Sequence, residues 1–488
     1  MPGRRRLPRS SPETQGVDPR ALDALVADLV ALPELHSVMV LRHGAVVAEG
    51  WVAPYGPERL HELFSLSKSF TATAVGFAVA EGLLDLDDLL VDHFPDRVPA
   101  DPDPRLRSLR LRHLLTMTTG HEDEPVIYRA QDWVAEFLAA PLPHEPGTHF
   151  LYNTAASYVL AATVQQVTGE RLLAYLRPRL LEPLGITGAT WDRCPRGVDL
   201  GGLGLSLTTE DIAAFGQLFL QDGVWDGRRV LPQGWVAAAS AAQVPNGDPV
   251  TGGDWWQGYG YQMWRCRHDG YRGDGAFGQL CVVLPEQDVV VAVTAAVADM
   301  QQPLDALWRH LLPALSDGPR PADDEGRAAL ERRLAGLRLD PPSGAPTSPT
   351  GARVSGRTIR FADTSVPPEP DGQSWTVPTS AVLETGEDAD RLTVRWGRRT
   401  VRVDVGHDAP VTNRLRLRRR TPEDVLVSGA WTGPDTYVLT CRFVDSPFVA
   451  TVTATVDGDD VTLVAELNVA FGATRSVPVT GHLVPSAG

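Results

Sequence analysis

The chain has 488 residues, of which 43% are hydrophobic and 22% are charged, and its formal net charge is −16. A chain of this length exceeds one ordinary hydrophobic core, so two or three domains are expected. The acidic balance argues against nucleic acid or an anionic membrane surface as the partner.

The predicted elements begin with a helix, because PRALDALVADLVAL (19–32) repeats apolar residues at helical spacing. The segment HSVMVLRHGAVVAEGW (36–51) predicts two strands joined by a tight hairpin at His43-Gly44. From Ser65, SLSKSFTATAVGFAVAEGLL predicts a buried, mostly apolar helix with Gly82 near its end. Residues 85–235 then read as mainly helical, with many proline and glycine turns.

Strand character returns at GYGYQMWRC (258–266), GQLCVVLP (278–285) and DVVVAVTAAV (288–297). A last helix, QQPLDALWRHLLPAL, follows at 301–315. Two early strands, a large helical insert and three late strands predict one α/β domain over residues 1–318. Its antiparallel sheet would be closed by both ends of this part of the chain.

A short charged helix and the Pro/Gly/Ser/Thr-rich segment DPPSGAPTSPTGA make residues 319–352 a predicted linker. Residues 353–488 alternate polar and apolar residues, with closely spaced turn signals such as VDGDDV (456–461). This pattern predicts an all-β domain, either a barrel or a sandwich.

The four cysteines are scattered without C-x-x-C spacing, so neither a disulfide framework nor a zinc site is expected. No run of 18 apolar residues is present, and the basic start MPGRRRLPRSS lacks the apolar region of a signal peptide. The sequence therefore predicts a cytoplasmic protein with reduced thiols.

Among 45 lysine and arginine residues there is one lysine, Lys68, three residues after Ser65. Residues three apart share a helix face, and a serine used as a nucleophile needs a proton acceptor. A lysine can be that acceptor, or hold a neighbouring acceptor ionised, when burial and the positive helix end lower its pKa. Arginine cannot, because it stays charged. Ser65 and Lys68 are thus candidate catalytic residues, although a single remaining lysine can also be incidental.

An S-x-x-K motif at the head of a buried helix is the signature of penicillin-recognising serine enzymes. Over about residues 8–315 the chain resembles the class C β-lactamase-related serine hydrolases, in LFSLSKSFTATAVGFAVAEGLLDLDD, LRHLLTMTTGH, PGTHFLYNTAASYVLAATVQQVTG and FGQLCVVLPEQDVVVAVT. That family includes esterases, D-amino-acid peptidases and 6-aminohexanoate-dimer hydrolases. The resemblance implies a β-lactamase/transpeptidase-like first domain. A weaker resemblance implies a lipocalin-like barrel or sandwich for the second.

The resemblance also implies roles for residues. It makes Ser65 the acylated nucleophile and Lys68 its amine partner. The Y-x-N motif of the family falls on Tyr152-Asn153-Thr154, so Tyr152 would be a general base whose phenol Lys68 keeps ionised. Thr154 stands where the family has asparagine and is a candidate substrate-binding residue. Asn153 or Thr154 alternatively caps the helix that follows.

The third family motif, K-T-G or H-T-G, falls on Gly273-Asp274-Gly275, followed by Ala276. Asp274 and Gly275 are therefore candidate substrate-binding residues. The missing cation argues against penicillin-like substrates, although Arg272 is close enough to replace it. The implied oxyanion hole uses the backbone N–H groups of Ser65 and Ala276, with Gln279 as the next candidate.

His121 and Trp256 are further candidate substrate-binding residues, with a role in the core as the alternative. The segment GHEDEP (120–125), with His144, Glu145 and His149, gathers metal-ligating side chains. Their spacing matches no zinc template, and acidic loops around a pocket explain them as well, so neither a metal nor a cofactor is expected.

The sequence thus predicts a serine hydrolase that cleaves small esters or amides through an acyl-enzyme on Ser65. One rival is a β-lactamase or a D-amino-acid carboxypeptidase or aminopeptidase; a β-lactamase or cell-wall carboxypeptidase would need export and usually a basic third motif. Another rival is a non-catalytic binding protein on the same fold, which would predict loss of the Ser/Lys/Tyr set. The expected partner is a small molecule, and a homo-oligomer is compatible with the sequence.

Overall fold

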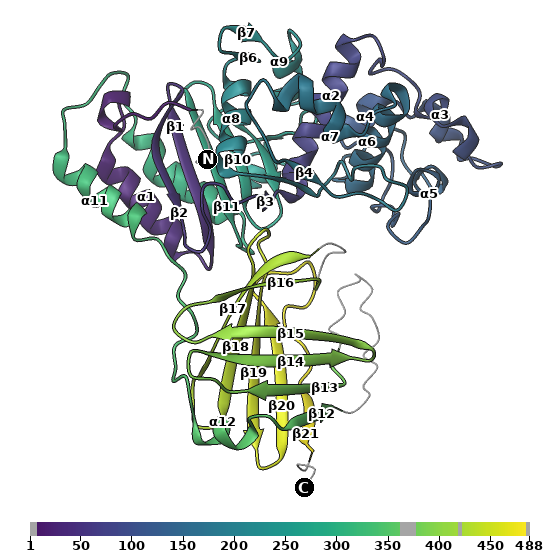
Figure 1. The fold of residues 1–488 in the computed structure, drawn as a ribbon. Helices are drawn as coiled ribbons and strands as arrows, with labels where there is room; N and C mark the ends of the chain where they lie inside the picture. The colour runs from purple at the N-terminus through teal and green to yellow at the C-terminus, as the bar shows by residue number, and fades with distance from the viewer. Residues whose placement is uncertain (1–6, 362–376, 418–421, 485–488) are drawn as a thin grey trace. The chain divides into compact units, whose positions relative to one another are not determined.

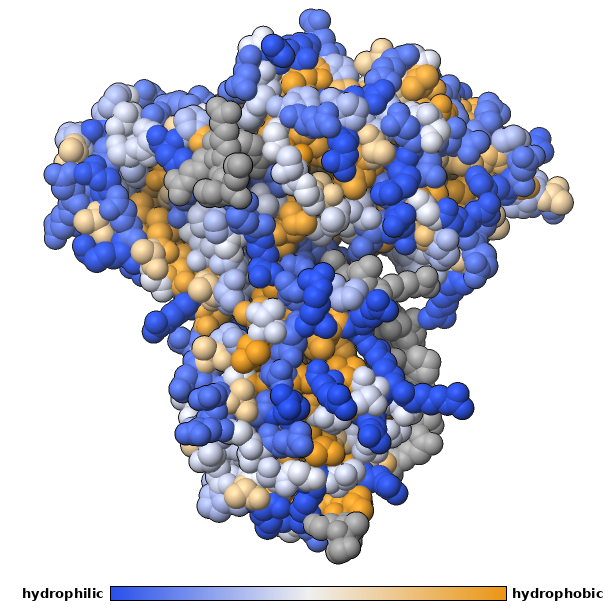
Figure 2. All heavy atoms as spheres, viewed as in Figure 1, coloured by the Kyte–Doolittle hydropathy of each residue, from blue (hydrophilic) through white to orange (hydrophobic). Residues whose placement is uncertain are grey.

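The computed structural model describes residues 7–361, 377–417 and 422–484, and the chain forms two compact units that divide between Leu337 and Arg338 (Figure 1). Within each unit, polar residues cover much of the visible face, and apolar residues show between them (Figure 2). Among the described residues, no helix combines the length and the apolarity that a membrane span requires. The predicted linker, residues 319–352, is divided between the units.

The first unit contains a six-stranded antiparallel sheet in the order β2-β1-β11-β10-β9-β8. Its strands, in that order, are Ala45–Trp51, Leu35–Arg42, Val289–Ala295, Gln279–Leu284, Tyr271–Gly275 and Trp264–Arg265. The turn between β1 and β2 has positive φ values at His43 and Gly44, which confirms the predicted hairpin. Strand β1 pairs with β11, so residues from both ends of the unit lie in the middle of the sheet.

Helices cover both faces of this sheet (Figure 1). Helix α8 (Thr209–Leu220) lies on one face, where a Cβ on Gly216 would come within 2.6 Å of Val290 Cγ1. Helices α1 (Pro19–Ala31) and α11 (Asp324–Ala335) lie on the other face. Salt bridges of 2.6 Å from Arg20 to Asp323 and of 2.5 Å from Arg333 to Asp23 join α1 to α11.

Between β2 and β8 the chain forms, besides α8, the helix α2 (Ser67–Ala80) and six further α-helices. The others are α3 (Leu90–His93), α4 (Leu111–Leu115), α5 (Trp133–Ala139), α6 (Thr154–Thr168), α7 (Leu172–Leu176) and α9 (Trp235–Ser240). The small strands are β3 (His61–Glu62), β4 (Thr190–Trp191), β5 (Leu205–Leu207), β6 (Val224–Trp225) and β7 (Arg228–Arg229).

Helix α2 is buried along its length, and its small polar side chains bond to the loops around it. Ser69 Oγ donates to the Gln262 carbonyl at 3.0 Å, and Thr71 Oγ1 donates to the Gly201 carbonyl at 2.7 Å. Ser67 Oγ accepts from the Leu205 N–H at 3.1 Å. Because buried polar groups are costly when unpaired, these bonds fix the helix in one position.

We expect Gly76→Val to destabilise the first unit by about 1–3 kcal/mol, the usual cost of overpacking a core. A Cβ on Gly76, in α2, would lie 2.5 Å from the indole of Trp235. The control is Gly56→Ala, which adds a Cβ where nothing lies within 4 Å. Denaturant unfolding measures both, and equal midpoints would contradict this account of the contact.

Two predicted elements differ from the observed ones. The catalytic-motif segment opens with a 3₁₀ turn, η2 (Phe64–Leu66), and α2 begins at Ser67, two residues later than predicted. The predicted strand at 258–266 is reduced to β8. Gly258 and Gln262 have φ values of 101° and 57°, so the backbone leaves the extended conformation there.

The second unit is a β-barrel, the first of the two predicted alternatives, with the helix α12 (Pro349–Val354) preceding it. Its strands are β12 (Thr358–Phe361), β13 (Ser380–Glu384), β14 (Ala389–Trp396), β15 (Arg399–Gly406), β16 (Val411–Leu415), β17 (Glu423–Trp431), β18 (Thr436–Phe443), β19 (Val449–Asp457), β20 (Asp460–Leu467) and β21 (Val479–Leu483). Nine of them close into a ring through a pairing of Gly406 in β15 with Ser428 in β17, and β16 pairs with β17 outside the ring. The predicted turn at 456–461 joins β19 to β20.

Candidate active site

Ser65 lies in η2, immediately before α2, and remains partly exposed. The preceding residue, Phe64, has a φ of 47°, a left-handed conformation that an aromatic residue rarely adopts. Such backbone costs about 1–3 kcal/mol and persists only where the surroundings impose it. The turn therefore leaves Ser65 partly exposed, while the helix that follows it is buried.

Lys68 is 1% exposed, and its Nζ has three oxygen neighbours. They are Ser65 Oγ at 2.9 Å, the Gly202 carbonyl at 2.8 Å and Thr154 Oγ1 at 3.3 Å. Burial lowers the pKa of Lys68 to about 7, and the negative charge of Glu124 opposes this shift. At neutral pH a large fraction of the amine is thus uncharged.

Tyr152 stacks on Trp264, with ring centroids 5.2 Å apart, and Lys68 Nζ lies 4.9 Å from the centre of the phenol ring. Trp264 packs in turn against Trp255 and Tyr259. Burial among these rings raises the pKa of Tyr152, while its interaction with the Ser65 side chain opposes the rise. The phenol therefore keeps its proton at neutral pH.

The start of α6 brings the second motif to Lys68. Asn153 caps this helix, because its Oδ1 accepts from the Ala156 N–H at 3.1 Å, so the capping alternative holds for Asn153. Thr154, the next residue, directs its hydroxyl to Lys68. Asn153 thus fixes the start of the helix, and Thr154 contacts the Lys68 amine.

Sequence reasoning missed two groups that act on Lys68, one by a hydrogen bond and one by its charge. The Gly202 carbonyl accepts from Lys68, and a Cβ on Gly202 would lie 2.6 Å from Thr154 Cγ2, so the loop approaches closely only as glycine. Glu124 Oε1 accepts from the Ala155 N–H at 3.2 Å, and its charge acts on Lys68. The paired glycines at 201–202 were the available signal for the first group.

Strand β9 carries the third motif. A Cβ on Gly275 would lie 2.0 Å from the Leu63 carbonyl oxygen, so the strand can approach η2 this closely only without a side chain. Asp274 is buried, its Oδ2 accepts from Arg272 Nε at 2.6 Å, and its charge adds to the raised pKa of Tyr152.

Arg272 does not replace the missing cation of the third motif. It is fully buried and donates to the Asp254 carbonyl at 2.8 Å as well as to Asp274. Its guanidinium also lies 4.5 Å from the ring centre of Trp255. The expectation that Arg272 holds a substrate carboxylate is therefore replaced by a structural role.

The oxyanion hole that the motifs imply uses the backbone N–H groups of Ser65 and Ala276. Neither donates to a backbone carbonyl among the hydrogen bonds of the described residues outside regular elements. Phe277, after Ala276, has a φ of 67°, and its ring meets that of Phe64 edge-on at 5.6 Å. Gln279, the other candidate, donates from Nε2 to the Ala276 carbonyl at 3.0 Å and so holds the peptide between Ala276 and Phe277.

The two remaining candidates, His121 and Trp256, make contacts of their own. His121 is buried and shares a 2.8 Å hydrogen bond with Thr119 Oγ1, and burial lowers its pKa to about 4. Trp256 is 45% exposed, and a Cβ on Gly252 would lie 2.1 Å from its ring. It is Trp255, the preceding residue, that joins the aromatic cluster around Tyr152.

A cavity of about 370 Å³ adjoins the start of α6 through Glu124. Four carboxylate side chains line it, those of Glu122, Asp123, Glu124 and Glu136. Its charge favours a neutral or cationic ligand over an anionic one.

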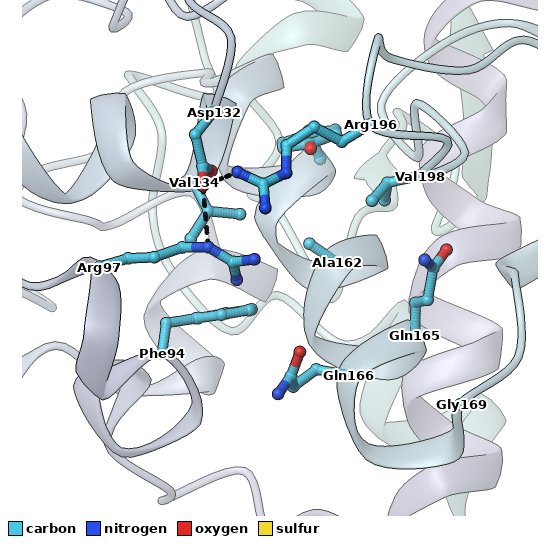
Figure 3. A pocket seen from close by; sticks show the side chains of 11 residues that line it. Phe94, Arg97, Asp132, Val134, Ala162, Gln165, Gln166, Gly169, Arg196 and Val198 are labelled. Atoms are coloured by element: carbon cyan, nitrogen blue, oxygen red, sulfur yellow. Dashed lines mark hydrogen bonds and ion pairs between the residues drawn. The ribbon is translucent and has the colours of Figure 1, made fainter.

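A second cavity, of about 410 Å³, is lined by Phe94, Tyr158, Gln165 and neighbouring residues (Figure 3). There Arg97 and Arg196 both form ion pairs with Asp132. Ser65, Lys68 and Tyr152 do not line this cavity, so its size does not make it the catalytic site.

Comparison with known proteins identifies a family and relatives of this chain. The family model described as Beta-lactamase matches residues 22–316. A 6-aminohexanoate-dimer hydrolase of Paenarthrobacter ureafaciens is 30% identical over 257 residues, 48% of this chain and 65% of that protein. A lovastatin esterase of Penicillium rubens is 30% identical over 197 residues, 34% of this chain and 49% of that protein. The chain thus spans about half to two thirds of the length of these relatives.

A solved structure extends the likeness. The crystal structure of SurE, 21% identical, covers 84% of this chain and 97% of its own, with a TM-score of 0.51. At this identity the likeness is one of fold, and it reaches beyond the first unit. The family match over residues 22–316 confirms the predicted β-lactamase/transpeptidase-like fold of the first unit.

Proposed function

Because this chain belongs to the beta-lactamase family, we propose that it is a serine hydrolase that cleaves small esters or amides through an acyl-enzyme on Ser65. The observation that carries the proposal is the 2.9 Å contact between Ser65 Oγ and a buried lysine amine. A serine hydroxyl is a weak nucleophile until a neighbouring base takes its proton.

In this proposal the base is Lys68 itself. A neutral amine has two N–H bonds and one lone pair. The Gly202 carbonyl and Thr154 Oγ1 can take the two N–H bonds, which leaves the lone pair facing the Ser65 O–H. With a pKa of about 7, the amine is poised to accept a proton near neutral pH.

Tyr152 then acts as a proton donor rather than as the ionised base suggested by the family resemblance. Its raised pKa keeps the phenol protonated, and Lys68 is too weakly charged at neutral pH to hold a phenolate. Tyr152 gives its proton to the leaving group and is reprotonated from Lys68. Both residues remain the acid–base pair, with their tasks exchanged.

The reaction follows from these assignments. Ser65 Oγ bonds to the substrate carbonyl carbon while its proton moves to Lys68, and the N–H groups of Ser65 and Ala276 hold the oxyanion. The bond to the alcohol or amine breaks as Tyr152 protonates the leaving group. Water then attacks the acyl-enzyme by the same route, and the acid leaves with Ser65 restored.

The surroundings favour neutral or positively charged substrates. Arg272 is buried in its own ion pair with Asp274, and the negative charge of Glu124 acts on Lys68. Penicillins carry a carboxylate, so a β-lactamase activity is disfavoured. The names of the two relatives, a hydrolase and an esterase, agree with ester or amide cleavage.

The proposal is tested with a fluorophosphonate probe, whose phosphorus bonds to an activated serine oxygen as fluoride leaves. Intact mass should show one adduct, peptide mapping should place it on Ser65, and Ser65→Ala should remain unlabelled. Neutral esters and amides should then be hydrolysed faster than a penicillin. Absence of an adduct, or an adduct elsewhere, would favour a binding protein on the same fold.

The pH dependence of kcat/KM should report Lys68. We expect kcat/KM for an activated ester to rise about tenfold per pH unit below pH 7 and to level off above it, because only the neutral amine accepts a proton. Glu124→Gln removes the charge that raises the pKa of Lys68. The part of the profile in which kcat/KM rises with pH should therefore move to lower pH.

The matched control for this shift is Glu136→Gln. It makes the same charge change in the same cavity, but Glu136 is not among the charges that shift Lys68. Its profile should overlay the wild type. If the rise of kcat/KM with pH stays in place in Glu124→Gln, the rise reports the titration of a group other than Lys68.

A further inference from the structure

Two histidines and a glutamate from separate loops meet in the first unit. The ligating atoms of Glu122, His144 and His149 all lie within 4.8 Å of one another. The rings of His144 and His149 stack with centroids 4.1 Å apart, and His144 Nε2 contacts Glu122 Oε2. The sequence spacing matched no zinc template because the loop at 120–125 is separated from the loop at 144–149.

These side chains are accessible to an ion from solvent. The side chain of Glu122 is 61% exposed and that of His144 is 36% exposed. Glu145 is excluded from the set, since its Oε1 accepts from Arg105 Nε at 3.0 Å.

Without a metal, His144 and Glu122 form a surface ion pair, and His149 contributes a ring stack with His144 and an electrostatic interaction with Glu122. A ring stack and a surface ion pair do not require two imidazole nitrogens to converge with a carboxylate oxygen. Imidazole nitrogens and a carboxylate are, in contrast, ligands that suit zinc and related divalent metals. Tetrahedral ligands about 2.0–2.1 Å from zinc lie roughly 3.3 Å apart, a contraction that exposed side chains reach by rotation.

We propose that Glu122, His144 and His149 form a binding site for a divalent transition metal such as Zn²⁺, with water completing the coordination. The ion would join the loop that carries Glu124 to the loop that leads into Tyr152. Backbone hydrogen bonds already hold these segments together, from the His144 N–H to the Gly120 carbonyl at 3.0 Å and from the Gly147 N–H to the Thr118 carbonyl at 2.7 Å. The metal is structural in this proposal, and no step of the hydrolysis uses it.

The test is titration of the full chain, without an affinity tag, with CoCl₂ followed by ZnCl₂. We expect visible Co²⁺ absorption that saturates at one equivalent per chain and disappears when Zn²⁺ displaces Co²⁺. His144→Ala and His149→Ala should each weaken binding by more than the roughly 10- to 100-fold that losing a second-shell partner costs. Glu122→Gln, which keeps the side-chain shape, should also weaken it.

The matched control is His482→Ala. His482 is an exposed histidine that forms an ion pair with Asp460 but belongs to no described three-ligand group. It should bind Co²⁺ like the wild type, and so should Ser65→Ala, because the site does not depend on catalysis. Circular dichroism of the metal-free variants verifies that each is folded. Unsaturable Co²⁺ uptake, or stoichiometric binding that survives both histidine substitutions, would overturn the proposal.

Discussion

Lys68→Arg is expected to lower kcat/KM for an activated ester by about 10²- to 10⁴-fold, which is what a positioned proton acceptor contributes. The guanidinium keeps its charge in any protein environment, so it offers Ser65 no lone pair. The same variant is expected to lose fluorophosphonate labelling. Stopped-flow measurement of ester hydrolysis at pH 8 gives the rate, and circular dichroism verifies the fold.

Because arginine is also larger than lysine, a second variant separates charge from shape. Lys68→Ala removes the amine and leaves a cavity beside Ser65, and a small added alkylamine should restore part of the activity. Rescue should follow the concentration of the neutral amine, not of its ammonium form. Wild-type activity in Lys68→Arg would show that the lysine is not the proton acceptor.

We expect Gly275→Ala to lower kcat by about 10²- to 10³-fold, a loss comparable to removing one oxyanion donor. The added Cβ meets the Leu63 carbonyl oxygen at 2.0 Å, a backbone atom that cannot rotate away. Strand β9 must therefore move from η2, which separates the Ala276 N–H from the Ser65 N–H. Steady-state kinetics should show most of the loss in kcat.

Gly273→Ala provides the comparison on the same strand. There the added Cβ meets Leu66 Cδ1 at 2.2 Å, the end of a side chain that can change rotamer. We expect a much smaller loss of kcat. Full activity in Gly275→Ala would remove Ala276 from the oxyanion hole, and equal losses in both variants would point to general disruption of the strand.

The sequence could predict the parts of the site that are local. Ser65 and Lys68 are three residues apart, and helical geometry alone brings them together. The Gly202 carbonyl and Glu124 escaped prediction for a physical reason. The first contributes a backbone atom, which any residue possesses, and the second acts through its charge from a loop whose path depends on the whole fold.

Other parts of the structure escaped prediction because they depend on a single residue position or a single strand pairing. Neighbouring Trp255 and Trp256 point to different surroundings, and only the backbone path of the loop decides which one joins Trp264. The choice between sandwich and barrel rests on one pairing, Gly406 with Ser428, since alternation of polar and apolar residues is common to both architectures.

The single lysine also gives this protein a spectroscopic label of its own. Protein grown with isotope-enriched lysine contains one labelled side chain in 488 residues, and that side chain is the buried amine beside Ser65. Its carbon and nitrogen resonances therefore need no assignment. Nuclear magnetic resonance during a pH titration would follow the proton on Nζ directly, and would do so again after a slow substrate has acylated the serine.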